Sequence, residues 1–184
     1  KLYLGFGIGY SNNQLIITNS GCVVNNDAYI GYDTGATNNS VLVAGAGSVW
    51  TNGGASVGYR SSYNYLAVTD GGQVISSGSS YVGTFSGANS NRLVVSGNGS
   101  VFKSDLEMGR EGCACQMIVT NGGWATVRYG SVGSSSNGNR VVVSGVNSRW
   151  DYSTLVVGNK GSGNQFEVNN GATVAGPIFP TQYN

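Results

Sequence analysis

The densest group of charged side chains in this sequence spans positions 103–111 and comprises Lys103, Asp105, Glu107, Arg110 and Glu111. Two or three carboxylates on one face, accompanied by Lys or Arg, can form the active site of a polysaccharide hydrolase or lyase. The first three residues alternate, as the outward side of a strand does. Equivalent positions in neighbouring segments are mostly Ser, Gly or Asn. We therefore interpret the group as a solvated face with local ion pairs.

Other catalytic and metal-binding patterns are missing from the sequence. There is no histidine, which excludes a Ser-His-Asp triad. Neither a phosphate-binding G-x-x-x-x-G-K-[ST] loop nor a calcium-binding G-G-x-G-x-D repeat occurs. Cys22, Cys113 and Cys115 fit neither a disulfide framework nor a zinc site, so we interpret them as free thiols, with a local Cys113–Cys115 bridge as the alternative. We predict no cofactor, no metal and no enzymatic activity.

Composition favours an ordered all-β chain. Charged residues make up 9% of the 184 residues, against roughly 25% in ordinary globular proteins. Regularly placed valines, eleven tyrosines and 31 glycines indicate strands joined by tight turns rather than disorder. The formal net charge of +1 offers no electrostatic basis for binding nucleic acid. No apolar stretch reaches the ~18 residues that membrane insertion would require.

A repeat runs through the chain, and glycine marks it. Seven glycines follow apolar residues at intervals of 24 to 27 residues. Such a period is typical of solenoids, in which each repeat buries its apolar face against the next. The glycines are Gly5, Gly31, Gly58, Gly83, Gly109, Gly133 and Gly158.

The repeat contains strands but no helix. An apolar–x–apolar pattern recurs in every repeat and ends in a β-branched column, whereas no window keeps a 3.6-residue apolar period. We predict a parallel β-solenoid (β-helix) of about seven coils of ~25 residues, with three short strands per coil. It covers residues 1–176 as a single domain, with an incomplete first coil at 1–14 and a Pro-containing tail at 177–184. The column is Ile17, Val43, Val68, Val95, Val119, Val143 and Val168.

A column of asparagines lies two residues before the start of this pattern. Amide side chains can donate to one neighbouring coil and accept from the other, which would form a ladder along the rod. The alternative is a set of solvated loop asparagines. Cys115 takes the fifth place, and the other six are Asn13, Asn39, Asn64, Asn91, Asn139 and Asn164.

Alternate coils carry a Ser-x-aromatic element that ends in Trp50, Phe102 or Trp150. Large rings in every second coil would interdigitate with small side chains in a narrow core. We therefore predict that these three rings are buried. The alternative is an exposed aromatic stripe that stacks on sugars.

The two ends of the chain carry complementary parts of a coil. Residues 1–14 match the second half of a coil, and residues 166–175 match the first part of one. Copies stacked head to tail could complete a coil at each junction and so form an open filament. The candidate junction residues are Leu2, Leu4, Phe166, Val168, Pro177, Phe179 and Pro180.

The segments 45–52, 66–74 and 29–32, which read GAGSVWTN, LAVTDGGQV and YIGY, resemble the repeats of bacterial autotransporter passenger domains. The resemblance covers residues 1–176. It implies a right-handed β-solenoid that is extracellular or attached to the bacterial cell surface. Proteins with such repeats include adhesins, biofilm proteins and enzymes, so the resemblance transfers no catalytic residue.

Three functions follow as hypotheses. The first is a structural extracellular protein whose partner is another copy of itself. The second is a fragment of a longer surface adhesin or autotransporter passenger. The third is a protein that binds or cleaves polysaccharide, with glycans or a host or biofilm matrix as partners.

Overall fold

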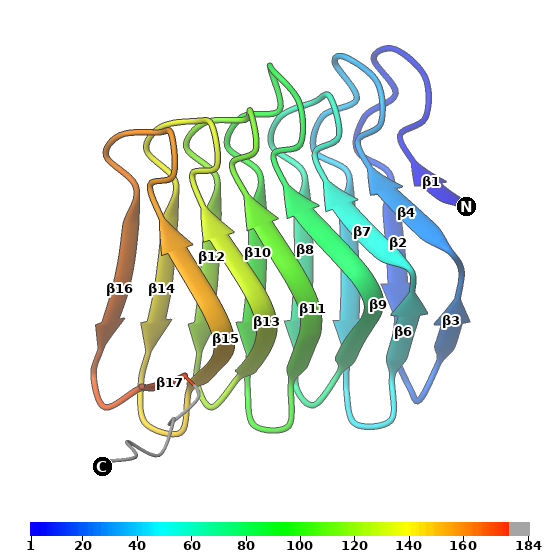
Figure 1. The fold of residues 1–184 in the computed structure, drawn as a ribbon. Helices are drawn as coiled ribbons and strands as arrows, with labels where there is room; N and C mark the ends of the chain where they lie inside the picture. The colour runs from blue at the N-terminus through cyan, green and yellow to red at the C-terminus, as the bar shows by residue number, and fades with distance from the viewer. Residues whose placement is uncertain (177–184) are drawn as a thin grey trace.

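The computed structural model describes residues 1–176, which wind into a β-solenoid of about seven stacked coils (Figure 1). All strand pairs are parallel, and each strand away from the two ends of the rod pairs with its equivalents in the coils before and after it. The described chain forms no helix with the length and hydrophobicity needed to cross a bilayer. Predicted coil length and parallel stacking are therefore confirmed.

One flat sheet forms the back of the rod in Figure 1 and consists of seven strands. The β-branched column runs across this sheet, because its residues pair in register from strand to strand. Val68, Val95 and Val119, for example, are direct neighbours and are fully buried. Alternating burial along each strand explains the period-two pattern of the sequence. The strands are β2 (Gln14–Ile17), β5 (Ser40–Ala44), β8 (Tyr65–Thr69), β10 (Arg92–Ser96), β12 (Gln116–Thr120), β14 (Arg140–Ser144) and β16 (Gln165–Asn169).

The second sheet is bent and has ten strands. The first two complete coils each have three strands, as predicted; from β9 onward the second and third strands join into one long strand that runs through the bend. A β-bulge lets the strand bend there while pairing continues on both sides. The strands are β1 (Leu2–Leu4), β3 (Cys22–Val24), β4 (Asp27–Ile30), β6 (Val49–Asn52), β7 (Gly54–Val57), β9 (Gln73–Val82), β11 (Val101–Met108), β13 (Trp124–Val132), β15 (Arg149–Val157) and β17 (Thr173–Ala175).

The three predicted core aromatics, Trp50, Phe102 and Trp150, are completely buried between the two sheets. Their burial excludes the exposed stripe at these positions. Each ring lies between small or medium side chains of the neighbouring coils, so large and small residues alternate along the rod. In order of coils this column is Val23, Trp50, Val74, Phe102, Ala125, Trp150 and Val174.

The asparagines stack along one edge of the rod and bond from coil to coil. The backbone N–H and the side-chain Nδ2 of Asn39 both donate to Oδ1 of Asn64, at 3.0 and 3.2 Å. Asn64 bonds to Asn91 in the same way, at 2.8 and 3.2 Å. At the position of Cys115 only the backbone continues the ladder, since its N–H donates to Oδ1 of Asn139 at 3.0 Å.

The glycine column is a consequence of the asparagine column. Each of the seven glycines has a positive φ, between +65° and +77°. In addition, a Cβ on Gly31 would lie 2.3 Å from Nδ2 of Asn64, and a Cβ on Gly58 would lie 2.0 Å from Nδ2 of Asn91. The glycine of one coil thus leaves room for the amide of the next coil. Two columns that the sequence presents separately form one interlocked edge.

Candidate functional site

A hollow of about 210 Å³ lies on the outer side of the bend formed by β9, β11 and β13. Three charged side chains line it: Lys103, Asp105 and Arg128. Its lining residues are Ser76, Ser77, Gly78, Lys103, Ser104, Asp105, Thr126 and Arg128.

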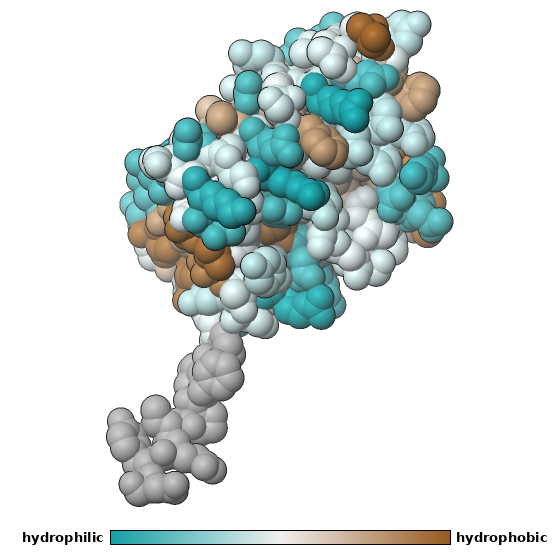
Figure 2. Space-filling model, turned by 45° about the horizontal axis from the view of Figure 1, so that its top comes forward, coloured by the Kyte–Doolittle hydropathy of each residue, from teal (hydrophilic) through white to brown (hydrophobic). Residues whose placement is uncertain are grey.

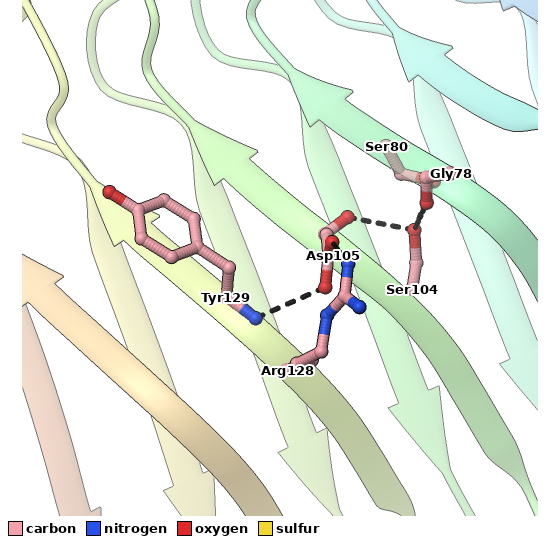
Figure 3. A network of polar contacts seen from close by, with 6 residues as sticks. All are labelled: Gly78, Ser80, Ser104, Asp105, Arg128 and Tyr129. Carbon is pink, nitrogen blue, oxygen red and sulfur yellow. Dashed lines mark hydrogen bonds and ion pairs between the residues drawn. The ribbon is translucent and has the colours of Figure 1, made fainter.

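A bulge in β9 shapes one wall of this hollow. Between the partner pairs Ile75–Lys103 and Ser79–Asp105, three residues of β9 lie opposite one residue of β11, Ser104. The Ser104 hydroxyl oxygen lies 3.1 Å from the carbonyl oxygen of Gly78, 2.8 Å from the Ser80 hydroxyl and 2.7 Å from the carbonyl oxygen of Asp105 (Figure 3), and its single proton is donated to one of them at a time. The bulged strand is therefore held by side-chain bonds where its ladder is interrupted.

Asp105 is the centre of the polar network in Figure 3. Its Oδ2 accepts a hydrogen bond from Nη2 of Arg128 at 2.7 Å, and its Oδ1 accepts one from the backbone N–H of Tyr129 at 3.1 Å. The bond from Arg128 outweighs the effect of partial burial and lowers the pKa of Asp105 below that of a free aspartate. The carboxylate stays ionised at neutral pH and both of its oxygens are occupied.

This geometry suits binding better than acid–base catalysis. Asp105 is the one carboxylate among the residues that line the hollow, whereas glycosidic cleavage uses a pair. The other members of the charged group have separate contacts. Glu111 accepts from the backbone N–H of Ser86 at 3.1 Å, and Arg110 lies 5.8 Å from the ring centre of Tyr81. Of the five charged residues, Asp105 forms an ion pair, and its partner Arg128 lies outside the group; within residues 1–176 no ion pair joins two of the five.

The cysteines are free: Cys22 is exposed, Cys113 is partly buried and Cys115 is buried. Burial raises the pKa of the Cys115 thiol to about 11, so it is not a thiolate at neutral pH. Within residues 1–176, no group of three or more His, Cys, Asp or Glu side chains is placed to hold a metal ion.

Comparison with protein-family models, curated proteins and solved structures found no match. The fold and the geometry of individual residues are therefore the basis for a functional proposal.

The predicted junction residues lie at opposite ends of the rod. Leu2 and Leu4 are half-buried at one end, and Phe166 is half-buried at the other, all packed against the core. Val168 is 46% exposed. Pro177, Phe179 and Pro180, with the rest of the predicted tail, lie outside the described residues.

Sequence reasoning missed Arg128, the partner of Asp105. The two residues lie 23 positions apart, one coil apart, so coil length alone could have suggested a search there. The register between β11 and β13 also shifts between Lys103 and Leu106, however, and no local signal in the sequence gives the size of this shift.

Asp105→Asn should reduce thermal stability at neutral pH but not in acid. The folded-state pKa of Asp105 is depressed, so its stabilising effect is present above the unfolded-state value of about 3.9 and is lost as pH falls through the lower folded value. Because the partner Arg128 is largely exposed, we expect a difference in melting temperature of at most about 2–4 °C at pH 7. Melting curves from pH 7 to pH 2 measure it.

Asp33→Asn is the matched control, because Asp33 lies in a loop outside this network. Its curve should follow that of the wild type at every pH. A gap between wild type and Asp105→Asn that is constant with pH would contradict the assignment of the ion pair.

Proposed function

We propose that this protein is a non-enzymatic structural component of the bacterial cell surface or its surroundings, built to stack end to end into a longer rod. The observation that carries the proposal is that its two ends are matching half-coils. Coil stacking is already the interaction that holds the rod together, and a junction between copies would repeat it.

The bent sheet ends in a step at the C-terminal side. β17 pairs only with Arg149–Asp151 at the beginning of β15, so within the described residues Leu155–Val157 have no partner in a following coil. β1 occupies the corresponding half of a coil at the other end, where Leu2–Leu4 pair with Ala28–Ile30. In a stack, β1 of the next copy would fill the step and place its Leu2 beside Leu155.

The edge formed by asparagine and glycine is also complementary at the two ends. The side-chain Nδ2 of Asn13 donates to Oδ1 of Asn39 at 2.9 Å. No described residue donates a hydrogen bond to the Oδ1 of Asn13. At the opposite end, Gly158 has φ +74°, but no ladder amide of the described chain lies over it, unlike Gly133, which lies under Asn164. Asn13 of a second copy would occupy that position.

Apolar surface gathers where this contact would form. At the left of Figure 2, the end that carries β16 in Figure 1, hydrophobic surface is grouped, whereas most of the remaining visible face is polar or neutral. Phe166, Leu155 and Val174 are half-buried at this end, and Leu2, Leu4 and Leu15 at the other. Stacking would remove these apolar side chains from water.

A second candidate is a segment of a longer surface protein of the autotransporter-passenger type. The same half-coil ends would then continue into further coils of one polypeptide. The resemblance of segments 29–32, 45–52 and 66–74 to the repeats of passenger domains supports this alternative. In both cases the protein is extracellular and its ends are coil-stacking surfaces.

Cysteine cross-linking tests the stack directly. Gln14 and Gln165 are the exposed first residues of β2 and β16 and share one column. Across a junction their Cα atoms would be about 4.8 Å apart, within disulfide range. With Cys22→Ser and Cys113→Ser as background, Gln14→Cys plus Gln165→Cys should give a ladder of covalent multimers under mild oxidation. Electron microscopy should show rods of increasing length.

Gln14→Cys plus Gln116→Cys is the control, because Gln116 lies in the middle of the rod. It should give dimers at most. If the first pair also gives only monomers and dimers, and microscopy shows only short rods, self-stacking is wrong. Further coils encoded beyond both ends of this segment would then favour the longer surface protein.

A further inference from the structure

Aromatic side chains form two rows on the outer surface of the N-terminal coils. The inner row begins with Tyr3 and Tyr29, whose rings are stacked with their centres 5.2 Å apart and an interplanar angle of 14°. In the outer row the rings follow one another at 4.8–5.4 Å. The outer row is Phe6, Tyr32, Tyr59 and Phe85.

The inner row is interrupted by one missing ring. Strand pairing aligns Tyr29 with Ser56 of the next coil, and Ser56 with Tyr81 of the coil after that. A hollow of about 280 Å³ therefore opens between the two tyrosines. Asp27, Tyr29, Ser56, Ser79 and Tyr81 are among the residues that line it. We call it the tyrosine notch.

Both tyrosines of the notch have their outer faces covered. Tyr3 stacks on one face of Tyr29, on the side away from Ser56. Arg110, which belongs to the coil beyond Tyr81, lies 5.8 Å from the ring centre of Tyr81. On the side of Ser56, Tyr29 meets no ring of the inner row; Tyr59 of the outer row contacts it at an angle of 83°, with ring centres 5.0 Å apart. The hollow lies between Tyr29 and Tyr81, at the position where Ser56 supplies no ring.

We propose that the tyrosine notch binds a pyranose ring of a neutral polysaccharide. The apolar C–H faces of such a ring pack on aromatic faces, and its equatorial hydroxyls need donors and acceptors around the rim. Asp27 supplies a carboxylate acceptor, and Ser56 and Ser79 supply hydroxyls that donate or accept. Aromatic walls with a polar rim match a sugar better than an aliphatic or a highly charged ligand.

The dimensions of the notch fit one sugar ring. Two strand spacings separate the tyrosine positions by roughly 9.6 Å. Carbon–carbon contacts of about 3.5–4.0 Å on each side take up seven to eight of these ångströms and leave room for a puckered chair rather than a flat ring. The volume of about 280 Å³ lies just below the range of pockets for drug-sized ligands, which begins at roughly 300 Å³.

The bound sugar would belong to a chain. Ser76, Ser77 and Gly78 line the hollow at Asp105, and Ser79 and Tyr81 of the same strand line the notch. The two hollows are thus neighbours along the bend of the sheet, and a polysaccharide seated in the notch would continue over the serine-rich wall of the second. This site does not depend on end stacking, because its residues lie within single rods.

Affinity electrophoresis of the full chain through gels that contain xylan, mannan, laminarin or hydroxyethylcellulose tests the proposal. We expect at least one of these polymers to retard the wild type. Tyr81→Ala should weaken binding about tenfold by removing one stacking face. Ser56→Tyr should abolish retardation by placing a ring in the notch while leaving the fold intact, as circular dichroism would show.

Tyr63→Ala is the matched control, because Tyr63 is 62% exposed and lies outside the notch. It should be retarded like the wild type. Retardation that survives both Tyr81→Ala and Ser56→Tyr would overturn the proposal, and so would a wild type that none of the four polymers retards. Neither result would affect the cross-linking test of end stacking.

Discussion

Gly58→Ala should be among the most destabilising single substitutions in this chain, although it adds only a methyl group. Gly58 has φ +74°, and its new Cβ would lie 2.0 Å from Nδ2 and 2.2 Å from Cγ of Asn91. Asn91 is fully buried, accepts from Asn64 N–H at 2.8 Å and donates to the Ala88 carbonyl at 2.8 Å. Left-handed strain costs about 1–2 kcal/mol, and each lost buried hydrogen bond roughly 1–3 kcal/mol. We expect the free energy of unfolding to fall by about 4 kcal/mol or more.

Gly87→Ala separates the two causes. Gly87 has φ +86°, but nothing lies within 4 Å of its Cβ position, so only the backbone strain of about 1–2 kcal/mol applies. Urea unfolding followed by far-UV circular dichroism compares the variants. In a double-mutant cycle, Asn91→Ala should remove most of the extra cost of Gly58→Ala. Equal losses for the two glycine variants would mean that the column serves backbone conformation alone.

The coil and its columns were predictable because they depend on short-range periodicity and on a repeat that cannot bury its own face. Val68, Val95 and Val119 are spaced by one coil and therefore meet in register. The link between glycines and asparagines was not predictable, because spacing does not tell which amide lies over which glycine. Gly58 accommodates Asn91 of the next coil rather than Asn64 of its own.

The candidate site was only partly predictable, because it depends on a bulge and on an absent side chain. Lys103 and Asp105 line the central hollow, but the register between β11 and β13 shifts between Lys103 and Leu106, so spacing alone does not tell which residue of β13 lies beside Asp105. The tyrosine notch is the place where Ser56 interrupts a row of rings. A sequence displays the tyrosines, but strand register is needed to show that Tyr29 and Tyr81 lie on the two sides of Ser56.

The second large effect concerns the two buried tryptophans, which should respond differently to the same substitution. Trp50 and Trp150 are fully buried in one column, so replacing either by Ala should cost about 3–5 kcal/mol. Trp50 donates through Nε1 to Oδ1 of Asn25 at 2.7 Å, whereas Nε1 of Trp150 has no partner among the described residues. Trp50→Phe should therefore cost at least about 1 kcal/mol more than Trp150→Phe, which removes an unpaired buried N–H along with some apolar contact.

Phe102 provides an internal reference, because a benzyl ring already fills the same column two coils from each tryptophan. Phenylalanine at either site is thus compatible with the backbone, and the difference between the two variants reports the hydrogen bond. Far-UV circular dichroism in urea measures it without relying on tryptophan fluorescence. If Trp150→Phe proved as costly as Trp150→Ala, ring volume rather than polar pairing would govern this column, because a cavity would then outweigh the gain from removing the unpaired N–H.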